Sequence, residues 1–223
     1  MKAMILAAGR GERFRPITDT LPKPLISVCG KPLIFWHLEA LAQAGIHEVV
    51  VNISWLGQQI KDRLTDGQAF GVHIQYSEEL VALESAGGIQ KALKLLGTEP
   101  FLVINADIWC DYPLQNLIGK KYTKPHLILV DNPNFNPSGD FSIQQGLLQN
   151  CGDNMLTFSG ISVYPLPFAQ QFLAEKGSIV PYLRKWANQK SISAEHYDGK
   201  WYDVGTIERL QKLEQDLKTS TAH

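Results

Sequence analysis

The chain has 223 residues, of which 44% are hydrophobic, and its 21 Lys and Arg nearly balance its 22 Asp and Glu, leaving a formal net charge of -1. This length and composition suit one α/β domain with a single sizeable core. No basic run and no interleaving of basic with aromatic residues stands out, so we expect no nucleic-acid partner.

The sequence also bears on the compartment. The N-terminal apolar run at 3–8 is too short for the core of a signal peptide, and no stretch approaches the length of a membrane span. Cys29, Cys110 and Cys151 are odd in number and widely spaced, which disfavours both a disulfide framework and a zinc site. We therefore expect a reduced, cytoplasmic protein without a membrane partner, as a monomer or small homo-oligomer.

The first half of the chain alternates apolar strands with amphipathic helices. We expect strands at 4–6, 48–53, 72–76 and 101–105, and helices at 32–44, 56–64 and 89–96. This rhythm is typical of a mostly parallel sheet covered on both faces. In such sheets ligands bind at the carboxyl ends of the strands.

The second half has a different pattern. We expect a strand at 126–130, a turn-rich loop at 131–140, alternating strands at 141–148 and 156–164, and helices at 181–189 and 206–218. Asp198 and Gly199 form an Asp-Gly pair between alternating residues, which predicts a β-hairpin. Thr206 is placed to cap the last helix.

The first strand leads into a glycine-rich segment that carries cations. Residues 6–16 read LAAGRGERFRP, and PKPL follows at 22–25. Glycines let backbone N–H groups approach a phosphate, and Arg13 and Lys23 supply the positive charge that a triphosphate requires. A dinucleotide fingerprint would need glycine at Phe14, and a P-loop would need Gly-Lys-Ser/Thr, so the segment indicates another kind of nucleotide site.

Two aspartates are candidates for a metal site. Asp107 follows the apolar strand 101–105, where a buried charge requires a partner. Asp203 lies in WYDVGT at 201–206, just before the last helix, a place where a lone Asp is most often a cap. Mg²⁺ commonly takes one or two carboxylates together with phosphate oxygens.

The ordered segments LAAGxGxRxxP, PKPL and VxGKPLI (28–34) resemble those of the sugar-phosphate nucleotidyltransferases. These enzymes join a sugar 1-phosphate to a nucleoside triphosphate and release pyrophosphate. The resemblance implies a Rossmann-like three-layer α/β sandwich with a mostly parallel central mixed sheet. It also implies one domain over 1–223, with a nucleotide-binding half at 1–110 and a sugar-binding half at 111–223.

The resemblance assigns roles to particular residues. Asp107 and Asp203 would hold Mg²⁺, Arg13 would bind the triphosphate, and Lys23 would neutralise the reacting phosphates. These four make the expected catalytic set. The nucleotide is expected against Ala7, Gly9, Gly11, Glu12, Arg13, Lys23, Gly87 and Gly88, and the sugar against Asn105, Asp140 and Gly160.

Departures from the family pattern narrow the expected substrates. The chain lacks the Glu-Lys-Pro segment whose lysine binds the sugar phosphate in longer thymidylyl and guanylyl relatives, and it lacks a hexapeptide-repeat extension. With its loop NPNFNPSGDF at 132–141, it is most similar to uridylyltransferases of cell-wall sugar recycling, which implies UTP and a sugar 1-phosphate as substrates. A mannose-1-phosphate guanylyltransferase, a glucose-1-phosphate thymidylyltransferase and a catalytically silent sugar-nucleotide-binding regulatory subunit remain alternatives.

Overall fold

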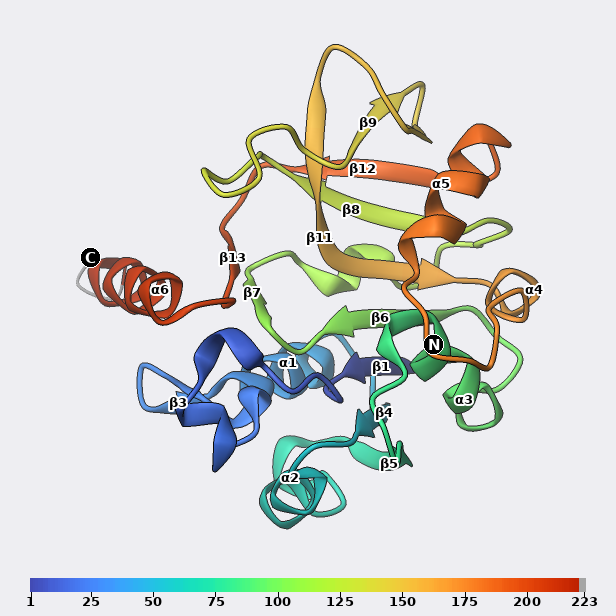
Figure 1. Ribbon diagram of the computed structural model, residues 1–223. Coiled ribbons are helices and arrows are strands. Elements are labelled where there is room, and N and C mark those ends of the chain that lie inside the picture. Colours follow the sequence, from blue (N-terminus) through green and yellow to red (C-terminus); the bar gives the residue numbers. More distant parts are fainter. Residues whose placement is uncertain (221–223) are drawn as a thin grey trace.

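A nine-stranded mixed sheet runs through the whole computed structural model, which describes residues 1–220 (Figure 1). Residues 221–223 of the expected domain lie outside the described residues. The sheet order is β5-β4-β1-β6-β11-β8-β12-β10-β9. Its strands are β1 (Ala3–Leu6), β4 (Glu48–Ile53), β5 (His73–Glu78), β6 (Phe101–Asn105), β8 (His126–Val130), β9 (Phe141–Gln144), β10 (Leu147–Gln149), β11 (Met155–Tyr164) and β12 (Ser193–Tyr197).

Helices cover both faces of this sheet, as the sequence predicts. The helices are α1 (Leu33–Gln43), α2 (Gly57–Leu64), α3 (Glu84–Leu96), α4 (Leu166–Ala169), α5 (Val180–Asn188) and α6 (Ile207–Ser220). Side chains alternate along the strands, so that Ile5 packs in one apolar core with α1 and α2, and Met4 packs in another with α3 and α5. The expected three-layer α/β sandwich is confirmed.

The direction of the strands changes in the middle of the sheet. The pairs β5–β4, β4–β1 and β1–β6 are parallel, whereas β11 pairs antiparallel with both β6 and β8. The sheet is therefore continuous across the two expected halves. Its register along β8 shifts between Phe158 and Ser162, next to Gly160, which has a positive φ of 86°. This bulge bends β11 beside the end of β6.

The predicted hairpin around Gly199 is wrong. Residues 193–197 form β12 and pair with β8 in the large sheet. The strand after the turn, β13 (Trp201–Asp203), instead pairs with β7 (Ile108–Cys110) in a separate two-stranded sheet. The Tyr202 ring packs edge-on against Trp109, with 6.0 Å between the ring centroids. Because β13 pairs with β7, it lies near the end of β6 and does not form a hairpin with β12.

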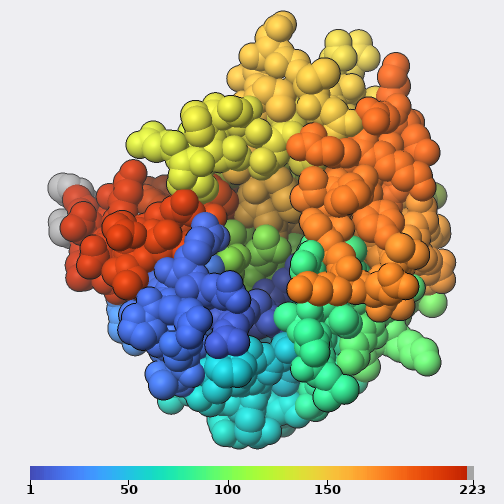
Figure 2. All heavy atoms as spheres, in the orientation of Figure 1, coloured from blue at the N-terminus to red at the C-terminus, as the bar shows by residue number. Residues whose placement is uncertain are grey.

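The last helix packs against the N-terminal region of the chain. Leu213 of α6 is fully buried in a third core with Phe14, Val28 and Leu33. A second short ribbon, β2 (Ser27–Val28) with β3 (Lys31–Pro32), belongs to this region. Figure 2 shows the red C-terminal segment directly beside the blue N-terminal one. No helix among residues 1–220 is long and apolar enough to cross a membrane.

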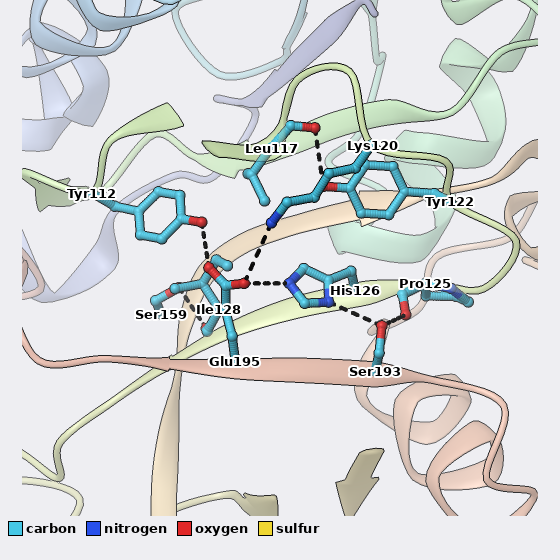
Figure 3. Close-up of polar contacts among 10 residues, drawn as sticks. All are labelled: Tyr112, Leu117, Lys120, Tyr122, Pro125, His126, Ile128, Ser159, Ser193 and Glu195. Atoms are coloured by element: carbon cyan, nitrogen blue, oxygen red, sulfur yellow. Dashed lines mark hydrogen bonds and ion pairs between the residues drawn. The ribbon is translucent and has the colours of Figure 1, made fainter. Parts of the chain in front are cut away.

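A polar cluster on β12 ties the connection between β7 and β8 to the sheet (Figure 3). Glu195 accepts hydrogen bonds from the Tyr112 hydroxyl and from His126 Nε2, the latter at 3.2 Å, and Lys120 Nζ lies 3.9 Å from the same carboxylate. The hydrogen bonds from His126 and Tyr112 lower the pKa of Glu195 from 4.5 to about 2, although partial burial opposes the shift.

The variant Glu195→Gln is expected to be less stable than the wild type near neutral pH, by an amount that shrinks in acid. Between the unfolded pKa of 4.5 and the folded pKa of about 2, the unfolded state binds a proton that the folded state does not. The stability from the ionised carboxylate is thus complete above this window and is lost as the pH falls through it. Urea midpoints at neutral pH and at about pH 3 test this; a gap between the two proteins that does not change with pH would contradict it.

Candidate functional site

Two cavities lie at the edge of the sheet where the parallel strands β1, β4 and β6 end. The larger, about 740 Å³, lies between the glycine-rich loop after β1 and the segment from β5 into α3. The smaller, about 360 Å³, lies between the end of β6, the loop 131–140 and β13. Asn105, the last residue of β6, lines both. Figure 2 shows a hollow bounded by the blue N-terminal segment and by the teal and orange segments.

The glycine-rich loop is fixed by contacts with its neighbours. The backbone N–H of Ala7 donates to Asn52 Oδ1 at the end of β4, at 2.7 Å. Gly11 has a left-handed φ of 69°, and a Cβ there would lie 3.0 Å from the Cβ of Lys23. Glycine therefore lets the loop lie directly against the lysine. Gly9 has nothing within 4 Å of its Cβ position and lines the larger cavity, as do Gly11 and Glu12.

Lys23 and Asp107 meet between the two cavities. Lys23 begins a short helical turn (Lys23–Leu25) between two prolines and is only 6% exposed. Its Nζ donates to Asp107 Oδ2 at 2.6 Å. A small cavity of about 80 Å³, lined by Ala7, Gly9, Lys23, Asn105 and Asp107, lies at this point. A buried ammonium is stable only with such a partner, so Asp107 holds the Lys23 ammonium in place at the cavity wall.

Asp203 lies beside Asp107, although the two are far apart in the sequence. In the β13–β7 ribbon Asp203 is opposite Ile108, and the backbone N–H of Val204 donates to the Asp107 carbonyl at 2.8 Å. Burial raises the pKa of Asp203, and the negative charge of Asp107 raises it further. Asp203 Oδ1 is buried and has no hydrogen-bond partner among residues 1–220.

Two arginines approach Asp203. Arg209 Nη1, from the first turn of α6, lies 3.1 Å from Asp203 Oδ2. A Cβ at Gly205 would lie 2.5 Å from Asp203 Oδ1, 2.8 Å from Arg209 Nη1 and 3.1 Å from Arg13 Nη2. The three charged groups therefore converge over Gly205, where any larger residue would separate them. The structure thus brings all four expected catalytic residues to one place.

The expected sugar residues lie around the smaller cavity. Asn105 and Asp140 line it together with Asp107 and Asp203. Asp140 also holds the loop in shape, since its Oδ2 accepts the backbone N–H of Phe158 at 2.9 Å. Gly160 lies behind Asn105, and a Cβ there would approach Asn105 Nδ2 to 2.8 Å. Close packing against Asn105 therefore explains why position 160 holds a glycine.

Gly87 and Gly88 are also explained by packing within the structure. Both are buried in the first turns of α3. A Cβ at Gly88 would lie 2.8 Å from Asn52 Nδ2 and 2.9 Å from Glu79 Oε1. Glu84 and Ser85, earlier on the same helix, are the residues that line the larger cavity. A direct contact of Gly87 or Gly88 with a nucleotide stays a prediction.

Sequence reasoning missed a buried polar network at the larger cavity. Asn52 is 2% exposed and Glu79 5% exposed, and Asn52 Nδ2 donates to Glu79 Oε1 at 2.7 Å. Glu79 Oε2 accepts the backbone N–H of Leu83 at 2.7 Å. The network joins the ends of β1, β4 and β5 to the start of α3. The sequence does hold a sign of this network, because Asn52 interrupts the apolar run of β4. A polar side chain buried in such a strand requires a hydrogen-bond partner.

Trp55 and Arg209 were missed as well. The Trp55 indole donates to the Thr18 carbonyl at 2.9 Å and carries the Arg10 guanidinium 4.3 Å from its ring centroid. Both Trp55 and Arg10 line the larger cavity. Arg209 lies 3.4 Å over the ring of Phe135, which comes from the loop 131–140. No sequence pattern in this chain links Arg209 to Asp203 or Phe135 before the fold is known.

The site fits a metal ion that takes some of its ligands from the protein and the others from the substrate and water. Within residues 1–220, no group of three His, Cys, Asp or Glu is placed to hold a metal. Asp107 and Asp203 instead offer two mutually repelling carboxylates, one with an oxygen that lacks a partner. A divalent cation would relieve this repulsion, with phosphate oxygens and water as its other ligands.

Comparisons with known proteins agree with this geometry. The family model described as Nucleotidyl transferase matches residues 2–137. The N-acetylmuramate alpha-1-phosphate uridylyltransferase of Neisseria meningitidis serogroup B is 48% identical over 224 aligned positions, which cover 96% of this chain and 97% of the relative. The mannose-1-phosphate guanyltransferase beta-A of Xenopus laevis is 28% identical over 220, covering 92% of this chain but 61% of the relative.

Solved structures show the same fold. A crystal structure of a putative glucose-1-phosphate thymidylyltransferase from Bacillus anthracis, in complex with a sucrose, superposes with a TM-score of 0.84. The superposition covers 96% of this chain and 94% of the Bacillus anthracis chain, and the two sequences are 20% identical.

Proposed function

This chain belongs to the nucleotidyl transferase family, and from that premise we propose that it makes UDP-N-acetylmuramate and pyrophosphate from UTP and N-acetylmuramate α-1-phosphate. The expected family is thereby confirmed. We place the reaction in the cytoplasm, in cell-wall sugar recycling, with Mg²⁺ as the metal ion. The proposed acting species is a monomer or a small homo-oligomer.

The observation that carries this proposal is end-to-end similarity to one kind of enzyme. The uridylyltransferase relative matches along nearly its whole length, whereas the chain spans only 61% of the Xenopus guanyltransferase. The absence of a Glu-Lys-Pro segment from these 223 residues also argues against the guanylyl and thymidylyl alternatives. A silent regulatory subunit would be expected to have lost part of the catalytic set, yet Arg13, Lys23, Asp107 and Asp203 all converge at the cavities.

Enzymes of this family generally use a divalent metal ion. In our proposal Asp107 and Asp203 hold it, because their carboxylates share a cavity wall and Asp203 Oδ1 has no hydrogen-bond partner among residues 1–220. When bound, the ion supplies positive charge at the phosphates and helps to orient them.

The chain's own residues provide the remaining requirements of the reaction. In the proposed reaction, an oxygen of the sugar phosphate attacks the α-phosphorus of UTP, the new P–O bond forms, and pyrophosphate leaves with the electrons of the broken bond. Backbone N–H groups of the loop at Gly9 and Gly11 are offered to the phosphates, and Arg13 and Lys23 neutralise their charge. In this proposal Asn105, which lines both cavities, contacts both substrates.

Pyrophosphate release tests the proposal. Wild-type protein with Mg²⁺ is assayed with UTP, dTTP, GTP and CTP against the 1-phosphates of N-acetylmuramate, N-acetylglucosamine, glucose and mannose. We expect the highest kcat/KM for UTP with N-acetylmuramate 1-phosphate. A preference for GTP with mannose 1-phosphate or dTTP with glucose 1-phosphate would replace the proposed substrates, and release with no pair would favour a regulatory subunit.

A further inference from the structure

The proposed sugar carries a negative charge that the sugar cavity does not match. N-acetylmuramate differs from N-acetylglucosamine by a lactyl ether, so its 1-phosphate carries an additional carboxylate. The 360 Å³ cavity is lined by Asp107, Asp140 and Asp203, and among the described residues no Lys or Arg lines it. The lining of this cavity therefore offers the additional carboxylate no cationic side chain to bind it.

A second cavity, which supplies cations, adjoins the first. It has a volume of about 570 Å³ and shares Phe135, Trp201 and Asp203 with the sugar cavity. Three further lining residues, Glu208, Arg209 and Lys212, come from α6, and Lys200 lines the cavity just before β13. The rings of Phe135 and Trp201, with centroids 6.5 Å apart, stand between the two cavities. Phe135, which is 44% exposed and lies in a loop, marks the boundary that an arm of the sugar would cross between the two cavities.

The acids of this second cavity already have partners. Asp131 Oδ1 is bound by His196 Nε2 at 2.8 Å, and Asp203 Oδ2 lies 3.1 Å from Arg209. A hydrogen bond from the side chain of Thr206, the residue before α6, lowers the pKa of Glu208, so this carboxylate also has a partner.

Lys212 differs from these groups. It is exposed on α6, and within the described part of the chain no ion pair or hydrogen bond joins it to another group. Arg209 is paired with Asp203, and Lys200, which also lines this cavity, is not without a partner. Among residues 1–220, Lys212 is therefore the cation of this cavity that remains available to an incoming anion.

We infer that this second cavity is the subsite for the carboxylate arm of an acidic sugar 1-phosphate, with Lys212 as the cation that binds the carboxylate. Arg209, stacked 3.4 Å over the Phe135 ring and paired with Asp203, forms the wall that separates the arm from the reacting phosphates. The inference rests on the proposed function, because it requires a sugar with a carboxylate.

The test compares two sugars that differ only in this arm. The ratio of kcat/KM for N-acetylmuramate 1-phosphate to that for N-acetylglucosamine 1-phosphate, both with UTP, is measured for wild type and for Lys212→Glu. Reversing the charge replaces attraction by repulsion, so the ratio is expected to fall about tenfold, and Lys212→Arg is expected to retain most of it. Lys218→Glu, a reversal elsewhere on the exposed surface of α6, is the matched control and should leave the ratio at the wild-type value.

The outcomes separate this inference from the proposed function. If the wild type itself does not prefer the acidic sugar, the proposed substrate is wrong. If the wild type prefers it and Lys212→Glu keeps the wild-type ratio, the substrate stands and the subsite is overturned. An equal fall in Lys218→Glu would point to the general charge of the helix and would also overturn the subsite.

Discussion

Replacing Asp203 with asparagine is expected to lower kcat by about a thousandfold or more, with little change in the fold. The amide keeps the shape of the side chain but loses the charge that a divalent cation requires. Asp203 Oδ1 accepts no hydrogen bond within residues 1–220, so the change breaks no structural contact at that atom. Turnover at saturating Mg²⁺ and both substrates is the measurement.

The thermal stability of this variant distinguishes a catalytic from a structural role. Burial and the charge of Asp107 raise the pKa of Asp203, so ionising this carboxylate costs the folded protein stability as the pH rises above the ordinary pKa of the group. A neutral side chain should therefore leave the Tm equal or higher. Asp111→Asn serves as control, because Asp111 lines neither substrate cavity and accepts hydrogen bonds from the Tyr197 hydroxyl and the Lys200 backbone N–H. Turnover within tenfold of wild type in Asp203→Asn would refute the assignment.

Replacing Lys23 with methionine is expected to reduce kcat/KM about a hundredfold to a thousandfold. The reason is that the variant lacks the ammonium that stabilises the negative charge developing on the reacting phosphates. Methionine fills the space along the Gly11 loop but carries no ammonium. Asp107 loses its partner at 2.6 Å, yet its side chain is 41% exposed, so water replaces that contact and the fold persists. The initial rate is measured across UTP and sugar phosphate concentrations.

Lys31→Met provides the matched control for this loss. Lys31 is also ion-paired, with Glu39 at 2.5 Å, and lies over the Trp36 ring, but it lines neither substrate cavity. It should lower stability slightly and leave kcat/KM near wild type. Similar losses in the two variants would mean that Lys23 acts through the fold of the loop and not on the phosphates.

The parallel half of the fold is predictable from the sequence because its strands are continuous apolar runs. The expected ranges 48–53 and 101–105 coincide with β4 and β6. The helix expected at 89–96 begins earlier, at Glu84. Gly87 and Gly88 favour a turn locally, but in the structure they let α3 pack closely against Asn52 and Glu79. Tertiary packing overrides propensity there.

Turns in the second half were harder to predict. The single strand expected at 141–148 is a hairpin of β9 and β10, which turns at Gln145 and Gly146 with φ of 51° and 74°. Gln-Gly is a weaker hairpin signal than Asn-Gly or Asp-Gly. At the Asp-Gly pair 198–199 the sequence predicts a hairpin that the structure does not contain. There β13 pairs with β7, which is distant in the sequence, and local residues do not encode that pairing.

The same contrast holds for the site. Asp107 follows from the sequence because a carboxylate ends an apolar strand, and Lys23 follows from its place beside a glycine-rich loop. The pairing of Asp203 with Arg209, and of Asn52 with Glu79, depends on segments brought together only by the folded sheet. Of these four residues, motif order predicts a role only for Asp203, and the structure supplies its partner Arg209.

The central claim is tested most directly by competition in a single tube. Equal concentrations of UTP, dTTP, GTP and CTP are mixed with equal concentrations of the four sugar 1-phosphates, the protein and Mg²⁺, and the sugar nucleotides formed are identified by mass spectrometry. Under these conditions the product ratios report the relative kcat/KM values. The account predicts UDP-N-acetylmuramate as the dominant product, and dominance of any other sugar nucleotide would contradict it.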